Sequence, residues 1–226
     1  MITTTAKIIQ TDGKYLTIEP SDDIFRDVDR KEITSIELRL DDGRTISAEQ
    51  RRKIFALIRD ISLWSGHEPE ELRALMTWNF RLKANIDDFS LSDVDMTTAK
   101  NFITYLINFC FAYDVPTKDT LLNLTDDVGK YLYMCLEHRK CAVCNKCAEV
   151  HHVDRIGMGR NREHIVHVGL RAVALCHDHH DEVHGTSESE FFNYYHIQGI
   201  KLDKYLCKRL NLRKEERGTH NANIQS

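Results

Sequence analysis

The sequence predicts an α+β fold. A domain of mixed strands and helices should cover residues 1–137, a small domain rich in Cys and His residues 138–212, and a disordered polar tail residues 213–226. Two observations lead to this prediction. Strand-type alternation near the N-terminus is followed by apolar residues at helical spacing, and nine of the twelve His with four of the seven Cys lie between His138 and His184.

Strands are expected near the N-terminus. Residues 3–10 and 15–19 flank the dipeptide Asp12-Gly13, which is typical of a tight hairpin turn. Residues 33–40 also alternate between apolar and polar side chains, so we expect a further strand there. The first domain should therefore begin with a hairpin and a third strand.

Four helices are expected after these strands. Ser47 and Gln50 form a capping box, and the apolar residues that follow recur at helical spacing until Gly66. Pro69 suits the first turn of the next helix, where a backbone N–H has no partner in any case. In chain order, the helices should cover about residues 47–66, 69–80, 96–112 and 120–138.

Charge divides the chain into two different halves. Residues 1–137 carry 17 Lys and Arg against 24 Asp and Glu, whereas residues 138–226 carry 14 against 11. The first part is therefore acidic and the second mildly basic, which indicates two units with different roles. No apolar run is long enough to span a bilayer and no signal-peptide pattern is present, so we expect a cytoplasmic protein without a membrane partner.

One Cys and His pattern is typical of structural zinc. Cys141, Cys144, Cys176 and His179 would give a closed Cys3His set, in which a hairpin turn and the first turn of a helix supply two ligands each. Cys144 with Cys147 fits the same spacing, but Cys147 falls where the next strand should begin. In a small domain with few apolar residues, the metal would contribute much of the folding free energy.

A second pattern overlaps the first. His180 and His184 are four residues apart, so they lie on one helix face and can bind one ion, while His179 is rotated by about 100° toward another side. His151 and His152 would point to opposite faces of a strand. One of the pair should be a metal ligand, and the other would be a suitable general base at neutral pH.

These residues resemble the HNH (ββα-metal) nuclease family, in particular HNH nucleases carried by phages of Gram-positive bacteria. The likeness covers about residues 138–200 and rests on the segments 151–162 and 175–184. The order of Glu149, the His pair and the helical His pair is also similar to colicin-type DNases. The resemblance implies a zinc-supported, treble-clef-like domain that hydrolyses DNA with one divalent ion, Mg²⁺, Mn²⁺, Ni²⁺ or Zn²⁺, beside the structural zinc.

The resemblance also implies roles for single residues. His152 would be the general base, Glu149 would orient the site, and the slot of the family's middle Asn falls on Arg171, although Asn161 or His167 could replace that Asn. The catalytic ion would be bound by His151, His180 and His184. Arg155, Arg160 and Arg162 would hold the DNA backbone, unless their loop is simply solvated.

The first domain resembles the Orf (NinB) family of phage recombination mediators. The strand–strand–helix order and the helix start at residues 47–50 are similar to that family. The resemblance implies a homodimer that handles single-stranded, duplex or branched DNA in phage replication or recombination; the alternative is a scaffold or dimerisation domain. Two other functions stay open for the whole chain: a non-catalytic single-stranded-DNA-binding mediator with a zinc-stabilised C-terminal module, and an endonuclease that recognises modified bases.

Overall fold

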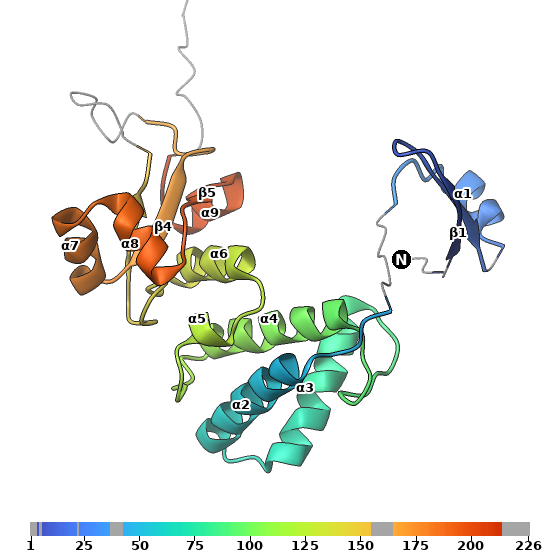
Figure 1. Ribbon diagram of the computed structural model, residues 1–226, viewed down its shortest axis with the longest axis horizontal. Helices are drawn as coiled ribbons and strands as arrows, with labels where there is room; N and C mark the ends of the chain where they lie inside the picture. The colour runs from blue at the N-terminus through green and yellow to red at the C-terminus, as the bar shows by residue number, and fades with distance from the viewer. Residues whose placement is uncertain (1–3, 5, 22, 37–42, 155–164, 214–226) are drawn as a thin grey trace, which may run out of the picture. The chain divides into compact units, whose positions relative to one another are not determined.

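The computed structural model describes residues 4, 6–21, 23–36, 43–154 and 165–213, and it confirms the α+β class (Figure 1). Contacts within the chain divide it into two compact units, residues 1–44 and 45–226. Both Cys and His patterns belong to the second unit. Among the described residues, no helix is both long and apolar enough to cross a membrane.

The first unit contains the predicted hairpin. Strands β1 (Ala6–Thr11) and β2 (Leu16–Pro20) pair antiparallel. Between them, the Asp12 carboxylate accepts hydrogen bonds from the backbone N–H groups of Lys14 and Tyr15, at 2.9 and 2.7 Å. These bonds close the turn that the Asp-Gly dipeptide predicts.

The strand predicted over residues 33–40 is not found where the structure can test it. Residues 33–36 form no strand, and residues 37–40 lie outside the described part of the chain. A short helix, α1 (Phe25–Arg30), precedes this segment. The amide of Ile33 donates to the carbonyl of Val28 in that helix, at 3.1 Å, so it is not available to a neighbouring strand.

Three long helices form the first half of the second unit. They are α2 (Ala48–Ser65), α3 (Pro69–Ala84) and α4 (Met96–Ala112). The capping box at the start of α2 is confirmed, because the side chains of Ser47 and Gln50 each accept a hydrogen bond from the other residue's backbone amide. Helix α2 ends at Gly66, whose φ of 76° is a left-handed conformation that favours glycine. Helices α2 and α4 pack together through apolar faces that are almost fully buried.

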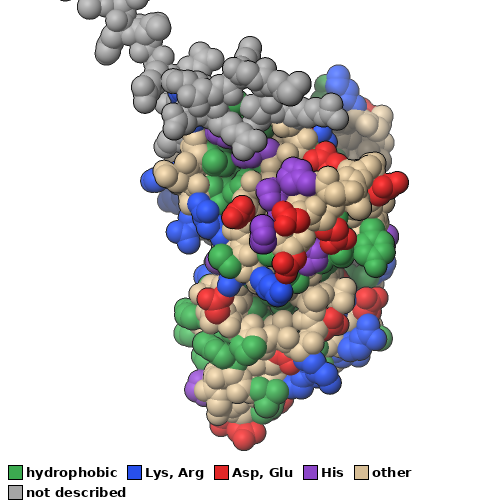
Figure 2. Space-filling model, turned by 90° about the vertical axis from the view of Figure 1, so that its left-hand side faces the viewer, with side chains coloured by type: hydrophobic (Ala, Val, Ile, Leu, Met, Phe, Trp, Pro, Cys, Tyr) green, Lys and Arg blue, Asp and Glu red, His purple; other side chains and the backbone are tan. Residues whose placement is uncertain are grey.

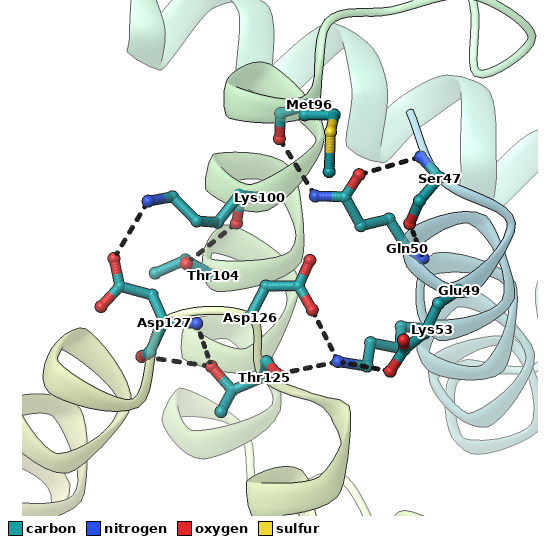
Figure 3. Close-up of polar contacts among 10 residues, drawn as sticks. All are labelled: Ser47, Glu49, Gln50, Lys53, Met96, Lys100, Thr104, Thr125, Asp126 and Asp127. Atoms are coloured by element: carbon teal, nitrogen blue, oxygen red, sulfur yellow. Dashed lines mark hydrogen bonds and ion pairs between the residues drawn. The ribbon is translucent and has the colours of Figure 1, made fainter. Parts of the chain in front are cut away.

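The predicted helix over residues 120–138 is two helices, α5 (Leu121–Leu124) and α6 (Val128–His138). The break between them is stabilised from α2 (Figure 3). The ammonium group of Lys53 donates to the carbonyl oxygen of Thr125 at 3.0 Å and to the carboxylate of Asp126 at 2.6 Å. This contact spans more than 70 positions in the sequence, so the local helical spacing does not predict it.

The second half of the unit is a small sheet with short helices. The strands are β3 (Glu149–His152), β4 (Arg171–Leu175) and β5 (Ile200–Lys201), and the helices are α7 (His177–Gly185), α8 (Glu188–Tyr195) and α9 (Lys204–Arg209). Strand β4 lies in the centre of the sheet and pairs antiparallel with both neighbours. Helices α6 and α7 both contact β4, whose residues 172–175 are buried. Helix α7 thus packs against the central strand, and side chains of α7 meet a side chain of the neighbouring β3.

Candidate active site

The structure brings Cys141, Cys144, Cys176 and His179 together. The first two lie in the turn between α6 and β3, Cys176 is the N-cap of α7, and His179 lies in the first turn of that helix. Their ligand atoms all lie within 4.8 Å of one another. A hairpin turn and a helix start therefore contribute two donors each, as the spacing predicts.

The distances within this group fit a tetrahedral metal site. The sulfur atoms of Cys144 and Cys176 are 3.6 Å apart, and Nδ1 of His179 lies 3.5 Å from the Cys141 sulfur and 3.1 Å from that of Cys176. Zinc–sulfur bonds of 2.3 Å would place two thiolates about 3.8 Å apart in a regular tetrahedron. The donors are thus already spaced as the ligands of one ion.

Without an ion, Cys144 favours the neutral thiol. Burial raises the pKa of the Cys144 thiol to about 12; a hydrogen bond from the backbone of Lys146 lowers it in part, and the charge of the neighbouring Cys141 raises it further. Thiolates bind zinc, whereas thiols do not. A positive ion in the centre would remove the cost of forming the thiolates, so this group can hold a metal ion.

Cys147 lies outside this group. Its side chain is exposed, and its backbone forms an isolated bridge with Lys140 at the base of the turn. Of the two spacings that the sequence allows, the structure therefore brings Cys141 with Cys144 to the other ligand atoms.

Asn145 stabilises the cysteine turn and has no counterpart in the metal patterns. It adopts a left-handed conformation with φ of 61°. Its side-chain oxygen Oδ1 accepts from the backbone amide of Leu121 at 3.0 Å, and its side-chain nitrogen Nδ2 donates to the hydroxyl of Tyr131 at 2.7 Å. These bonds connect the turn to α5 and α6. In the sequence, only its position directly after Cys-x2-Cys could have indicated that Asn145 closes the turn, since Asn tolerates a left-handed backbone conformation.

A second group consists of His151, His180 and His184. One ligand atom of each lies within 4.8 Å of the others. The ring centroids of the three side chains are 4.7 to 5.2 Å apart. His151 comes from β3, and the helical pair comes from one face of α7, so strand and helix meet at this point.

Electrostatics favour the neutral form of His180. Burial lowers the pKa of His180, and the neighbouring His151 and His184 lower it further. The carboxylate of Glu149 acts in the opposite direction. Neutral imidazole is the form that binds metals. Because one ligand atom of each of the three side chains lies close to the others, this group can also hold an ion.

His152 lies away from this group. Its Cα partner in β4 is Ala172, whereas that of His151 is Val173, so the two histidines point to opposite faces of the sheet. Nε2 of His152 lies 2.9 Å from Nδ1 of His167. His167 itself is buried, and its amide donates to the carbonyl of Arg213. His167 thus contacts the imidazole that the family pattern assigns as the base.

Arg171 does not make that contact. It neighbours Ala172 in β4, so its side chain points to the sheet face of His151 rather than that of His152. Its guanidinium binds the carboxylate of Asp154. The remaining predicted residues, Arg155, Arg160, Arg162 and Asn161, lie outside the described part of the chain.

Glu188 is a site residue that the sequence patterns do not indicate. It lies in the first turn of α8, and its carboxylate is 3.0 Å from Nε2 of His151. The two residues are 37 positions apart, and no recognised spacing connects them. Figure 2 shows the wider setting, in which histidine side chains (purple) and carboxylates (red) gather on one face of the molecule.

Comparison with known proteins places these sites in a family. A family model with the description "Putative HNHc nuclease" matches residues 20–213. The chain belongs to this family. The match extends well beyond the Cys- and His-rich part, so helices α2 to α6 also belong to the region that defines the family. Membership supports nuclease function for the chain. No curated protein and no solved structure matches it.

Proposed function

We propose that the chain is an HNH endonuclease that hydrolyses DNA phosphodiester bonds with the help of a divalent metal ion. One observation carries this proposal: His151 from β3 meets His180 and His184 from α7 at a common point. The adjacent His152 is the last residue of the short β3 and lies on the other face of the sheet.

The residues would be divided between two ions. His151, His180 and His184 would hold the catalytic ion, which would be Mg²⁺, Mn²⁺, Ni²⁺ or Zn²⁺, and the Cys3His group would hold a structural zinc. The catalytic ion, when bound, would supply Lewis-acid stabilisation of the charge that develops on the scissile phosphate and the leaving 3′-oxygen. Three protein ligands would leave room for the phosphate.

His152 would accept the proton of the attacking water. An imidazole titrates near neutral pH, so it can serve as a general base there. Neutral imidazole has one donor and one acceptor nitrogen. If Nε2 donates to Nδ1 of His167 across the 2.9 Å contact, Nδ1 of His152 is the nitrogen that takes the proton. His167 would then orient the base, the task of the middle Asn in the family.

A nuclease assay tests the proposal. Wild-type protein, His152→Ala, His180→Ala and His177→Ala are incubated with single-stranded, duplex and branched DNA and each of the four ions. His177 is a matched control, because it belongs to α7 but its side chain is 82% exposed and outside the His group. We expect cleavage by wild type and His177→Ala alone. Cleavage that persists in His152→Ala would refute the assigned base, and its absence in wild type with every substrate would refute the function.

A second function is favoured by one observation, the presence of Arg171 in the slot of the family's middle Asn. A non-catalytic recombination mediator with a zinc-stabilised module would bind single-stranded DNA without added metal and would nick nothing. In either case, the residues before 138 would handle DNA or form a homodimer, and the context would be phage replication or recombination in the bacterial cytoplasm. The same assay, with binding to single strands measured in parallel, separates the two functions.

A further inference from the structure

Glu188 contacts the metal-site histidine that is most deeply buried. Its Oε1 atom lies 3.0 Å from Nε2 of His151, whose side chain is only 6% exposed, whereas that of Glu188 is 42% exposed. A partly exposed carboxylate on α8 therefore contacts a buried imidazole of the site. It forms a connection between α8 and β3 that is independent of α7.

The chemistry of this contact determines which nitrogen of His151 can bind an ion. A carboxylate can only accept a hydrogen bond, so Nε2 of His151 must carry the proton. Nδ1 is then the nitrogen with the lone pair. Histidine ligands of metal sites commonly donate their second N–H to a carboxylate, which sets the tautomer and the ring orientation.

Glu188 is not itself one of the converging donors. The group of mutually close ligand atoms contains His151, His180 and His184, and Glu188 is not within the shared distance of 4.8 Å. Its carboxylate contacts Nε2 of His151. This position is that of a residue that supports a ligand, not of a fourth ligand.

We propose that Glu188 is a positioning residue of the His151–His180–His184 metal site, which it supports by accepting the Nε2 proton of His151 and thereby presenting Nδ1 to the ion. The inference rests on the proposed function, because it assumes that this group binds metal. It assigns to α8 a part in the site that the HNH pattern of β3 and α7 does not contain.

Cobalt(II) binding tests the inference on the full-length, zinc-loaded protein. The visible absorption of cobalt reports binding at the His group in wild type, Glu188→Ala, Glu188→Gln and Glu190→Gln. Glu190 is a matched control, because it lies in the same first turn of α8. We expect Glu188→Ala to bind cobalt about 10 to 100 times more weakly. Glu188→Gln should regain most of the affinity, since its amide oxygen still accepts from Nε2, and Glu190→Gln should bind like wild type.

The outcomes separate the inference from the function. Wild-type affinity in Glu188→Ala, while wild type binds cobalt beside its zinc, would overturn the role of Glu188 alone. An equal loss in Glu188→Ala and Glu188→Gln would also overturn it, because the carboxylate would then act through its charge. If wild type binds no second ion, the proposed metal site fails and the inference fails with it. Circular dichroism of each variant verifies that α8 is intact.

Discussion

Arg171 binds the carboxylate of Asp154 with both its backbone and its side chain. Its amide donates to one carboxylate oxygen at 2.7 Å, and its Nε and terminal nitrogen donate to the other at 2.9 and 2.7 Å. The Cα partner of Arg171 in β5 is Lys201. Two cations thus lie side by side, and the Asp154 carboxylate is the anion beside them, since both Arg171 and Lys201 lower its pKa. In a nuclease, DNA phosphate would be a second anion for this pair of cations.

We expect Arg171→Gln to weaken DNA binding with little dependence on sequence. A phosphate contact contributes about one unit to the slope of log affinity against log salt, so this slope should decrease by about 1. Asp154→Asn should have the opposite effect, because it releases the guanidinium from its carboxylate partner. Fluorescence anisotropy with labelled duplex DNA at several salt concentrations measures both. An unchanged slope in Arg171→Gln would remove Arg171 from the DNA-binding surface.

Replacing one cysteine of the Cys3His group should remove the structural zinc that we propose this group holds. We expect Cys176→Ser to purify without the zinc equivalent of the Cys3His group, and its Tm to fall by about 10 °C or more, since a structural metal contributes several kcal/mol to folding. Cys147→Ser should keep both its zinc and its Tm, because Cys147 is exposed and outside the group. Metal analysis and thermal unfolding measure the two effects. A loss of zinc in Cys147→Ser would instead favour the alternative spacing.

The ion pair between Lys53 and Asp126 should matter for stability. The Lys53 side chain is only 10% exposed, and removing one partner of a buried pair typically costs about 3–5 kcal/mol. We therefore expect Lys53→Met and Asp126→Leu each to lower the free energy of unfolding by an amount of this order. The double variant should lose less than the sum of the two, because no charge is left unpaired in it.

Glu49 offers the control for this pair. It also lies near the Lys53 ammonium, at 3.3 Å, but its side chain is 63% exposed. An exposed pair of this kind contributes about 0.5 kcal/mol or less, so Glu49→Gln should unfold almost like wild type. Urea titrations of the four variants give the comparison. Strict additivity of the Lys53 and Asp126 effects would contradict a direct interaction between them.

His138 should make stability depend on pH. Burial lowers its pKa below the usual value, and its Nε2 lies 2.9 Å from the side-chain oxygen of Asn108. When the pH falls through about 6.5, the unfolded chain binds a proton at this residue before the folded chain does. Stability is therefore lost as the pH falls through that range, and the loss ends once the folded protein is protonated too.

Replacing His138 with Gln should remove this contribution, because Gln can keep a hydrogen bond to Asn108 without titrating. Urea unfolding at pH 7.5 and 5.5 gives the change in free energy for each protein. The chain contains other histidines, so the prediction concerns the difference between the two proteins. We expect the free energy of unfolding to decrease less between pH 7.5 and 5.5 in His138→Gln than in wild type. An equal decrease in both would show that His138 does not contribute.

Local signals predicted most of the elements near them. The hairpin around Asp12, the capping box at Ser47 and the helix start at Pro69 depend on residues at most a few positions apart, and the structure contains all three. The convergence of the side chains within each of the two metal patterns was also predictable, because helical and strand periodicity determine which residues share a face.

Contacts that periodicity does not indicate account for the differences, and two of the three are between distant segments. Helical spacing over residues 120–138 cannot indicate that Lys53 binds the chain at Thr125 and Asp126. The alternation over residues 33–40 cannot indicate that the amide of Ile33 donates its hydrogen bond to a carbonyl of α1. Glu188 and His151 are separated in the sequence by β4 and α7, and only the folded chain brings them together.

Helix α7 carries side chains of both groups on neighbouring positions, since His179 faces the cysteines and His180 faces His151. Two ions bound there would share one rigid backbone, with a rotation of about 100° between their ligands. Loss of the ion held by the cysteines would release the N-terminus of α7 and with it the alignment of the second group. Removing the ion of the Cys3His group, with the other ion still supplied, would then abolish DNA cleavage. The binding of the two ions would therefore be thermodynamically linked.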